Sequence, residues 1–301
     1  MARRTWPAAA AARITRRRAL AAAAAVVAAG RAVAGGSGPQ APPLRLGLVT
    51  YTWGQDWDLP TLIANCIRAQ VAGVELRTSH AHGVEPALDA RQRAEVRSRF
   101  ADSPVTLVGL GSTCEYHSPD PVVIARNVAE TARFVKLCHD VGGGGVKVRP
   151  NALPADVPEE RTLEQIGRSL HEVSRHAADH GVQIRLEVHG RGTSDLPRIR
   201  RIMEVADHPN CVLCWNCNGE DLAGAGFAAN YEMVERWMGT VHIHDLRRTD
   251  YPWADLFTRL RACDAPGFTG WTLIEESVRP DDIVAALQEN RTLWDKLAVA
   301  S

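Results

Sequence analysis

The sequence predicts an α/β protein with a single (β/α)8 TIM barrel, and three features of its 301 residues indicate this. Apolar or alternating segments recur roughly every 30–40 residues, as strands separated by helices would. Between them lie stretches with apolar residues at three- and four-residue spacing, the period of an amphipathic helix. No G-x-G-x-x-G follows the first apolar segment, which argues against a doubly wound open sheet. Eight such units in about 255 residues fit one barrel.

The first 34 residues predict an export signal peptide rather than part of the fold. The paired Arg16 and Arg17 precede an apolar stretch, Leu20 to Ala29, and an A-x-A cleavage sequence ends at Ala34. This order resembles a twin-arginine signal, so we expect a periplasmic or otherwise exported protein that is cleaved near Ala34. The apolar stretch is about half the ~20 residues that span a membrane, so we expect no membrane contact after cleavage. An uncleaved membrane anchor is the alternative.

A Gly/Pro-rich linker over residues 35–43 leads into the expected barrel, residues 44–301. The strands are expected at 44–52, 74–78, 105–110, 146–149, 183–189, 212–216, 240–244 and 271–275. The clearest helices are expected at 59–72, 121–141, 162–180 and 281–297.

Charge and cysteine content restrict the partners of this chain. From Gly35 onward 28 basic residues stand against 35 acidic ones, a net charge of −7, so we expect no nucleic-acid partner. Cys211, Cys214 and Cys217 have the spacing of a metal-binding C-x-x-C run. Residues three apart in a strand point to opposite faces, however, so we expect small buried hydrophobes instead. The oligomeric state is left open, a homo-oligomer included.

Polar residues alternate with apolar ones in several strands, and this pattern indicates where a site would lie. The strand expected at 183–189 presents its apolar residues on one face and four polar residues on the other: Gln183, Arg185, Glu187 and His189. In a barrel the apolar face contacts the helices and the polar face lines the lumen. Other strands repeat this alternation at Glu75, Lys147, Arg149, His242 and His244. The C-terminal ends of the strands form the active-site face of such barrels.

Four segments, LEVHG, CWNCN, VHIHDL and TLIEE, resemble the xylose isomerase-like barrels of the sugar phosphate isomerase and epimerase superfamily. The resemblance includes GVELRTSHAHG and covers nearly the whole chain after the signal. It implies one divalent metal bound by a Glu, an Asp, a His and a Glu, which correspond here to Glu187, Asn216, His242 and Glu275. Asn216 departs from this pattern and removes one negative charge. The sequence leaves open whether its amide binds the metal or only forms hydrogen bonds.

Oxygen and nitrogen ligands of this kind suit Mn²⁺, Mg²⁺ or Zn²⁺, which polarise a sugar carbonyl and its neighbouring hydroxyl. By the resemblance, Glu187 and Glu275 both bind the metal and transfer protons through an enediol-type intermediate. Substrate-binding residues are expected in the same lumen: Glu75, His80, Lys147, Arg149, His189 and His244. Lys147 and Arg149 have a structural alternative, a salt bridge with Glu115 or Glu187. His189 and His244 could instead orient the metal ligands.

The expected function is isomerisation or epimerisation of a small carbohydrate. The alternatives are a keto-glycoside lyase that uses the same site, a non-catalytic sugar-binding barrel, and a metal-dependent abasic-site endonuclease. The acidic charge and the export signal argue against the endonuclease. Loops 247–253 and 277–281 lack the glycine that phosphate sites on barrels usually contain, so we expect a non-phosphorylated substrate.

Replacement of Arg16 and Arg17 by lysine should stop export while leaving the barrel unchanged, because the pair is predicted to belong to the signal alone. Immunoblots of periplasmic and cytoplasmic fractions measure export, and circular dichroism checks the fold. Unchanged periplasmic accumulation of the variant would exclude the twin-arginine interpretation.

Overall fold

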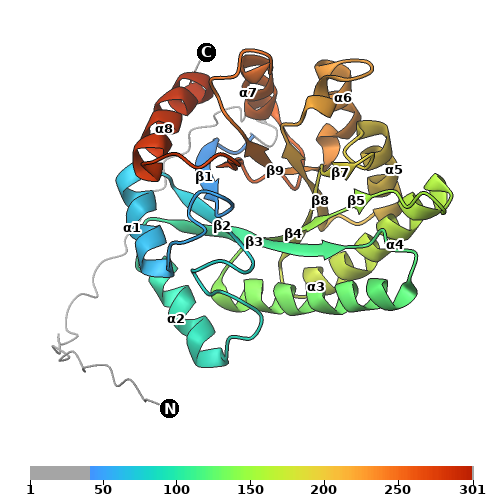
Figure 1. Cartoon of the computed structure of the whole chain (residues 1–301), viewed down its shortest axis with the longest axis horizontal. Helices are drawn as coiled ribbons and strands as arrows, with labels where there is room; N and C mark the ends of the chain where they lie inside the picture. Colours follow the sequence, from blue (N-terminus) through green and yellow to red (C-terminus); the bar gives the residue numbers. More distant parts are fainter. Residues whose placement is uncertain (1–40, 300–301) are drawn as a thin grey trace, which may run out of the picture. The chain divides into compact units, whose positions relative to one another are not determined.

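The structure, a computed structural model, describes residues 41–299. The predicted signal peptide and most of the predicted linker lie outside the described residues. Eight parallel strands form the barrel: β1 (Arg45–Val49), β2 (Gly73–Arg77), β3 (Thr106–Glu115), β4 (Gly145–Arg149), β6 (Gln183–Glu187), β8 (Cys211–Asn216), β9 (Met238–Ile243) and β10 (Trp271–Ile274). They close in the order β1-β10-β9-β8-β6-β4-β3-β2, which confirms the predicted (β/α)8 barrel (Figure 1).

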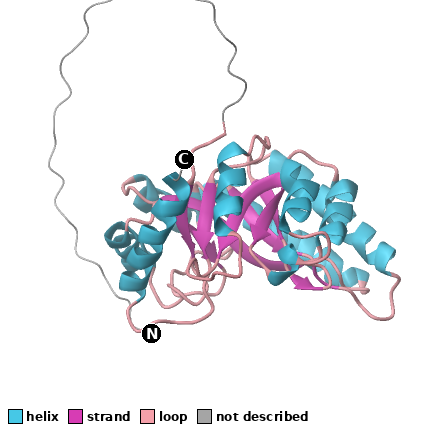
Figure 2. Ribbon diagram, turned by 90° about the horizontal axis from the view of Figure 1, so that it is seen from above, coloured by secondary structure: helices cyan, strands magenta, loops and turns pink. Residues whose placement is uncertain are grey.

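Helices surround the strands on the outside (Figure 2). Within residues 41–299 the α-helices are α1 (Leu59–Ala69), α2 (Ala90–Ala101), α3 (Pro121–Val141), α4 (Glu159–Ala178), α5 (Leu196–Ala206), α6 (Phe227–Val234), α7 (Trp253–Ala262) and α8 (Ile283–Val299). Two short 3-10 helices, η1 (Gly219–Leu222) and η2 (Glu235–Trp237), lie on either side of α6. Aspartates begin several helices; the side chain of Asp58, for example, accepts the backbone N–H of Thr61 at 2.9 Å.

Two features differ from the sequence expectation. Strand β3 continues to Glu115, five residues beyond the predicted end. A short parallel pair, β5 (Asn151–Ala152) with β7 (Gly190–Arg191), follows β4 and β6 on the same side of the barrel. Elements of two residues are too short to produce a periodic pattern, so the sequence could not indicate this pair.

The alternating strand residues divide between the two faces as predicted. Ile184 and Leu186 on β6 are fully buried in the apolar core, whereas Arg185 turns into the lumen. Its Nη1 donates to the carbonyl of Val108 at 3.0 Å. Glycine provides the space for this guanidinium, because a Cβ at Gly145 would lie 2.4 Å from Arg185 Nε.

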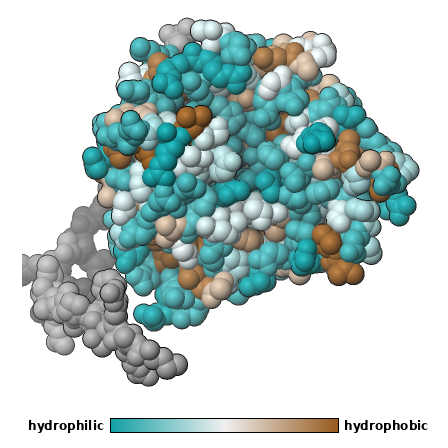
Figure 3. Space-filling view, viewed as in Figure 1, coloured by the Kyte–Doolittle hydropathy of each residue, from teal (hydrophilic) through white to brown (hydrophobic). Residues whose placement is uncertain are grey.

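The surface is mainly polar on the face shown in Figure 3, with hydrophobic residues in small separated patches. All seven cysteines are buried and free, and the strand position of Cys211, Cys214 and Cys217 predicted this burial for those three. Among the described helices, none combines the length and the apolar character needed to cross a membrane.

A buried carboxyl group outside the lumen was not indicated by the sequence. Asp221 in η1 is completely buried, and Tyr251 donates its hydroxyl proton to Asp221 Oδ2 at 2.6 Å. The indole of Trp215 donates in turn to the Tyr251 hydroxyl oxygen at 3.0 Å. Burial raises the pKa of Asp221 to about 7, although the hydrogen bond from Tyr251 opposes this. Asp221 lies in the polar sequence GED, which is typical of an exposed loop.

Replacement of Asp221 by asparagine should make the protein's stability less dependent on pH between about pH 4 and pH 7. In the wild type, the unfolded chain releases the Asp221 proton above about pH 4 while the folded protein retains it until about pH 7. This group therefore stabilises the fold fully below pH 4 and progressively less as the pH rises. The free energy of unfolding of Asp221→Asn, measured relative to that of the wild type, should therefore increase across this window. The increase should be about 1.4 kcal/mol for each unit by which the pKa of Asp221 differs between the folded and unfolded states.

Urea denaturation of both proteins at several pH values measures this effect. A stability difference that stays constant from pH 4 to pH 7 would contradict a raised pKa for Asp221.

Candidate metal and proton-transfer site

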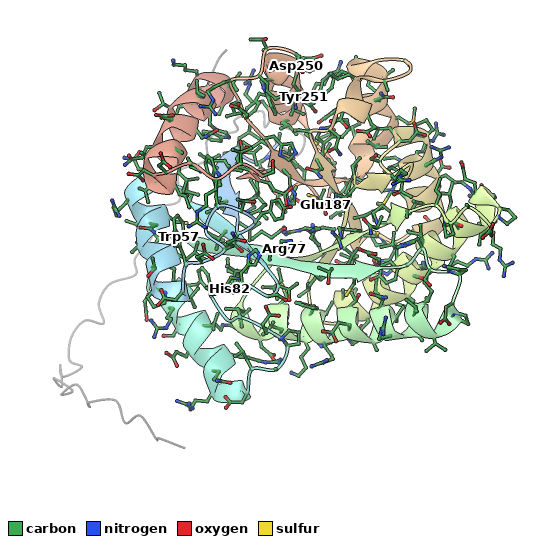
Figure 4. All side chains as sticks on the ribbon, in the orientation of Figure 1. Trp57, Arg77, His82, Glu187, Asp250 and Tyr251 are labelled. Atoms are coloured by element: carbon green, nitrogen blue, oxygen red, sulfur yellow. The ribbon has the colours of Figure 1, made fainter. Side chains whose placement is uncertain are left out.

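The lumen brings together the four residues that the resemblance selected. Glu187 ends β6, Asn216 ends β8, His242 lies near the end of β9, and Glu275 directly follows β10. Glu187, Asn216 and His242 are buried, and only a small part of Glu275 is exposed. Figure 4 shows Glu187 within the ring of strands, whereas Tyr251 lies outside it next to α7.

Three of these residues have the spacing of metal ligands. One ligand atom each from Glu187, His242 and Glu275 lies within 4.8 Å of the other two. Nδ1 of His242 faces both carboxylates, at 3.2 Å from Glu275 Oε2 and 3.7 Å from Glu187 Oε1. Throughout residues 41–299 no other cluster of His, Cys, Asp or Glu side chains has this spacing.

Asn216 is held by two hydrogen-bonding contacts. Its Nδ2 donates to Glu187 Oε1 at 3.0 Å, and its Oδ1 lies 2.9 Å from Nε2 of His244. Nδ1 of His244 donates in turn to the backbone carbonyl of Glu275 at 2.6 Å, so both contacts of this ring are hydrogen bonds only when each of its nitrogens carries a proton. The amide thus presents nitrogen, rather than oxygen, toward Glu187. Of the two roles left open by the sequence, this arrangement favours hydrogen bonding, and His244 orients Asn216 rather than lining an open pocket.

Lys147 on β4 completes the charged cluster. It is buried, and its Nζ donates to Glu187 Oε2 at 2.7 Å, which is one of the two salt bridges considered for it. Burial lowers the pKa of Lys147, but the carboxylates of Glu187, Glu275 and Glu75 outweigh burial and raise this pKa above its usual value.

The two carboxyl groups of the triad are ionised because cations stand beside them. Burial favours their neutral forms, but Lys147 and His242 hold the pKa of Glu187 well below its usual range. His242 likewise lowers the pKa of Glu275. Burial opposes a charge on His242 itself, yet the neighbouring Cys214 sulfur and then the carboxylates of Glu275 and Glu75 raise the pKa of its ring well above the usual value.

The donor set fits a divalent cation. Two carboxylates and one imidazole in a buried, negatively charged position are ligands for Mn²⁺, Mg²⁺ or Zn²⁺. Such an ion would replace the proton on His242 Nδ1, because a ligand nitrogen must be unprotonated.

The other candidate residues occupy different positions around the site. Arg149 forms an ion pair with Glu115, the structural alternative considered for it. His189 is half-buried close to Glu187, and its Nδ1 has no hydrogen-bond partner among the described residues. His80 lies 3.4 Å from the Arg77 guanidinium, in the loop after β2. Glu75 is completely buried beside His242, which sequence reasoning could not reveal because the two residues are 167 positions apart.

Solved structures with the same fold include several sugar enzymes. L-ribulose 3-epimerase has a TM-score of 0.70 at 19% identity, covering 85% of this chain and 94% of its own. The 3-keto-D-glucoside 4-epimerase YcjR from E. coli has a TM-score of 0.69 at 14% identity, and the match covers 83% of this chain and 98% of YcjR. The IOLI protein, solved with a bound zinc atom, has a TM-score of 0.70 at 15% identity, and the match covers 85% of this chain and 98% of the IOLI chain.

These identities show a shared fold. No curated protein sequence matches the chain. A family model described as xylose isomerase-like TIM barrel matches residues 63–297, which is most of the barrel. The chain therefore belongs to the xylose isomerase-like TIM barrel family.

Proposed function

We propose that this protein is a divalent-metal-dependent sugar isomerase or epimerase. The observation that carries the proposal is the buried triad of Glu187, His242 and Glu275, in which two carboxylates approach the same histidine nitrogen. Two carboxylates in one enclosed site can remove and return protons on neighbouring carbons of a sugar. The epimerases among the structural neighbours and the zinc bound by the IOLI protein support this choice.

Each polar side chain has a proposed role. When bound by Glu187, His242 and Glu275, the metal supplies polarisation of the sugar carbonyl and the adjacent hydroxyl. Glu187 is ionised and accepts the proton from the substrate carbon. Glu275, which also favours the ionised form, takes up a proton from solvent and returns it to the substrate from the opposite side. Lys147 orients Glu187 through its 2.7 Å hydrogen bond and donates to the enediolate oxygen.

The proposed substrate is a non-phosphorylated sugar or keto sugar. Three arginines in the loops after β9 and β10 could have attracted a phosphate, but each is paired with an aspartate. Arg247 contacts Asp245 and Arg248 contacts Asp250. Arg279 contacts Asp56. Ion pairs of this kind leave less positive charge for a phosphate group.

Arg149, His80 and His189 remain proposed substrate contacts, since they lie at or beyond the C-terminal ends of their strands. We also propose that the protein is exported by its N-terminal signal, where substrates without phosphate would be met.

Replacement of Glu187 by glutamine should reduce solvent-proton exchange at the substrate carbon by about 10²-fold or more, because the variant lacks the accepting carboxylate. Deuterium incorporation into a panel of non-phosphorylated ketoses and keto-glycosides, read by mass spectrometry, measures the exchange. Glu276→Gln is the matched control, since Glu276 follows Glu275 but lines a separate pocket with Asp245 and Asp282.

Exchange in Glu187→Gln at the wild-type rate would show that Glu187 is not the base. Deuterium uptake with release of the glycosidic leaving group would instead identify a lyase.

Replacement of Asn216 by aspartate should tighten Mn²⁺ binding by about tenfold or more. The change adds a carboxylate beside the proposed ion, and a unit negative charge at about 4 Å from a dication is worth roughly 2 kcal/mol even in water. It also places like charges next to Glu187 in the metal-free protein, so the metal relieves a repulsion. Isothermal titration calorimetry on metal-stripped protein measures the affinity. Unchanged or weaker binding would indicate that position 216 does not face the metal.

A further inference from the structure

We propose that Glu75 is a positioning residue that fixes His242 for metal binding, in place of the substrate contact expected from the sequence. The inference rests on the proposed metal site. It concerns a residue outside the triad, on β2, which is separated from β9 by β10 and β1 around the barrel.

The two side chains meet across the lumen. Oε1 of Glu75 lies 3.4 Å from Nε2 of His242, and both side chains are completely buried. The opposite ring nitrogen, Nδ1, faces Glu187 and Glu275. Glu75 thus contacts the side of the imidazole that is turned away from the triad, where a substrate bound to the metal would not reach it.

This arrangement selects one form of the imidazole. To bind a metal through Nδ1, His242 must present a lone pair there, and its single remaining proton must then be on Nε2. A carboxylate next to Nε2 accepts that proton as a hydrogen bond, which fixes both the tautomer and the ring orientation. Oε1 of Glu75 faces that nitrogen at 3.4 Å, which is longer than a hydrogen bond, so the two groups must approach by a few tenths of an ångström for Glu75 to accept the proton.

No other contact accounts for Glu75. Within the described part of the chain, its oxygens have no hydrogen-bond partner, and the contact with His242 is their only ion pair. A buried carboxylate without donors is costly for folding. The neighbouring strand also leaves space for it, because a Cβ at Gly111 would lie 3.2 Å from Glu75 Oε1. Arg185 adds a favourable charge deeper in the lumen but donates its hydrogen bonds elsewhere.

The test compares Mn²⁺ affinities of metal-stripped wild type, Glu75→Gln and a control by isothermal titration calorimetry. Glu75→Gln retains the shape of the side chain but loses its charge, and should weaken binding about 10–100-fold, the usual effect of losing such a partner. Asp221→Asn is the matched control, since it makes the same change at a buried carboxyl outside the triad and should bind Mn²⁺ as the wild type does. Thermal unfolding without metal checks that both variants fold.

A double-mutant cycle separates positioning from a general structural effect. If Glu75 acts through His242, Glu75→Gln should have no effect on Mn²⁺ affinity in a His242→Ala background. Glu75→Asp keeps the negative charge and should therefore bind Mn²⁺ more tightly than Glu75→Gln, though less tightly than the wild type. This second variant also tests the role of Glu75 if Glu75→Gln folds poorly.

Wild-type affinity in Glu75→Gln, or the same loss in the His242→Ala background, would overturn the positioning role alone. A wild-type protein that binds no divalent metal would overturn both this role and the proposed function.

Discussion

Three carboxylates, Glu75, Glu187 and Glu275, surround one imidazole inside the barrel, and the remainder of the site depends on balancing their charge. Buried anions of this number are stable only with paired cations. Lys147 provides one cation, the surroundings favour the protonated form of His242, and Arg185 lies deeper in the same lumen. A divalent ion bound to the triad would take over the role of the His242 proton. The same negative charge that makes the lumen costly to fold therefore favours binding of a cation there.

Asn216 adjusts this balance. An aspartate at this position would place a further negative charge against Glu187, whereas the amide donates a hydrogen bond to it. The contact between Asn216 and His244, and the hydrogen bond from His244 to the Glu275 backbone, join three strand ends into one network. The site is consequently less negative than a four-ligand site with three carboxylates would be. This difference bears on metal affinity more than on the architecture, since the side chains of the triad still converge.

The sequence predicted the barrel and the residues of its lumen because both follow from local periodicity. Period-two alternation assigned Glu187, Lys147 and His242 to the interior, and the closed sheet then brought them together. What the sequence could not predict are contacts between residues far apart in the chain. The pairing of Glu75 with His242 and the burial of Asp221 under Tyr251 depend on how strands and loops meet in space. The orientation of the Asn216 amide is likewise set by its two neighbours, which no spacing in the sequence specifies.

The central claim is that Glu187, His242 and Glu275 hold one divalent cation. Anomalous diffraction from crystals of the protein grown with Mn²⁺ tests it most directly. One strong peak is expected in the lumen, about 2.0–2.4 Å from a carboxylate oxygen of Glu187, from Nδ1 of His242 and from a carboxylate oxygen of Glu275. An empty lumen at saturating Mn²⁺, or a peak bound to other residues, would contradict it.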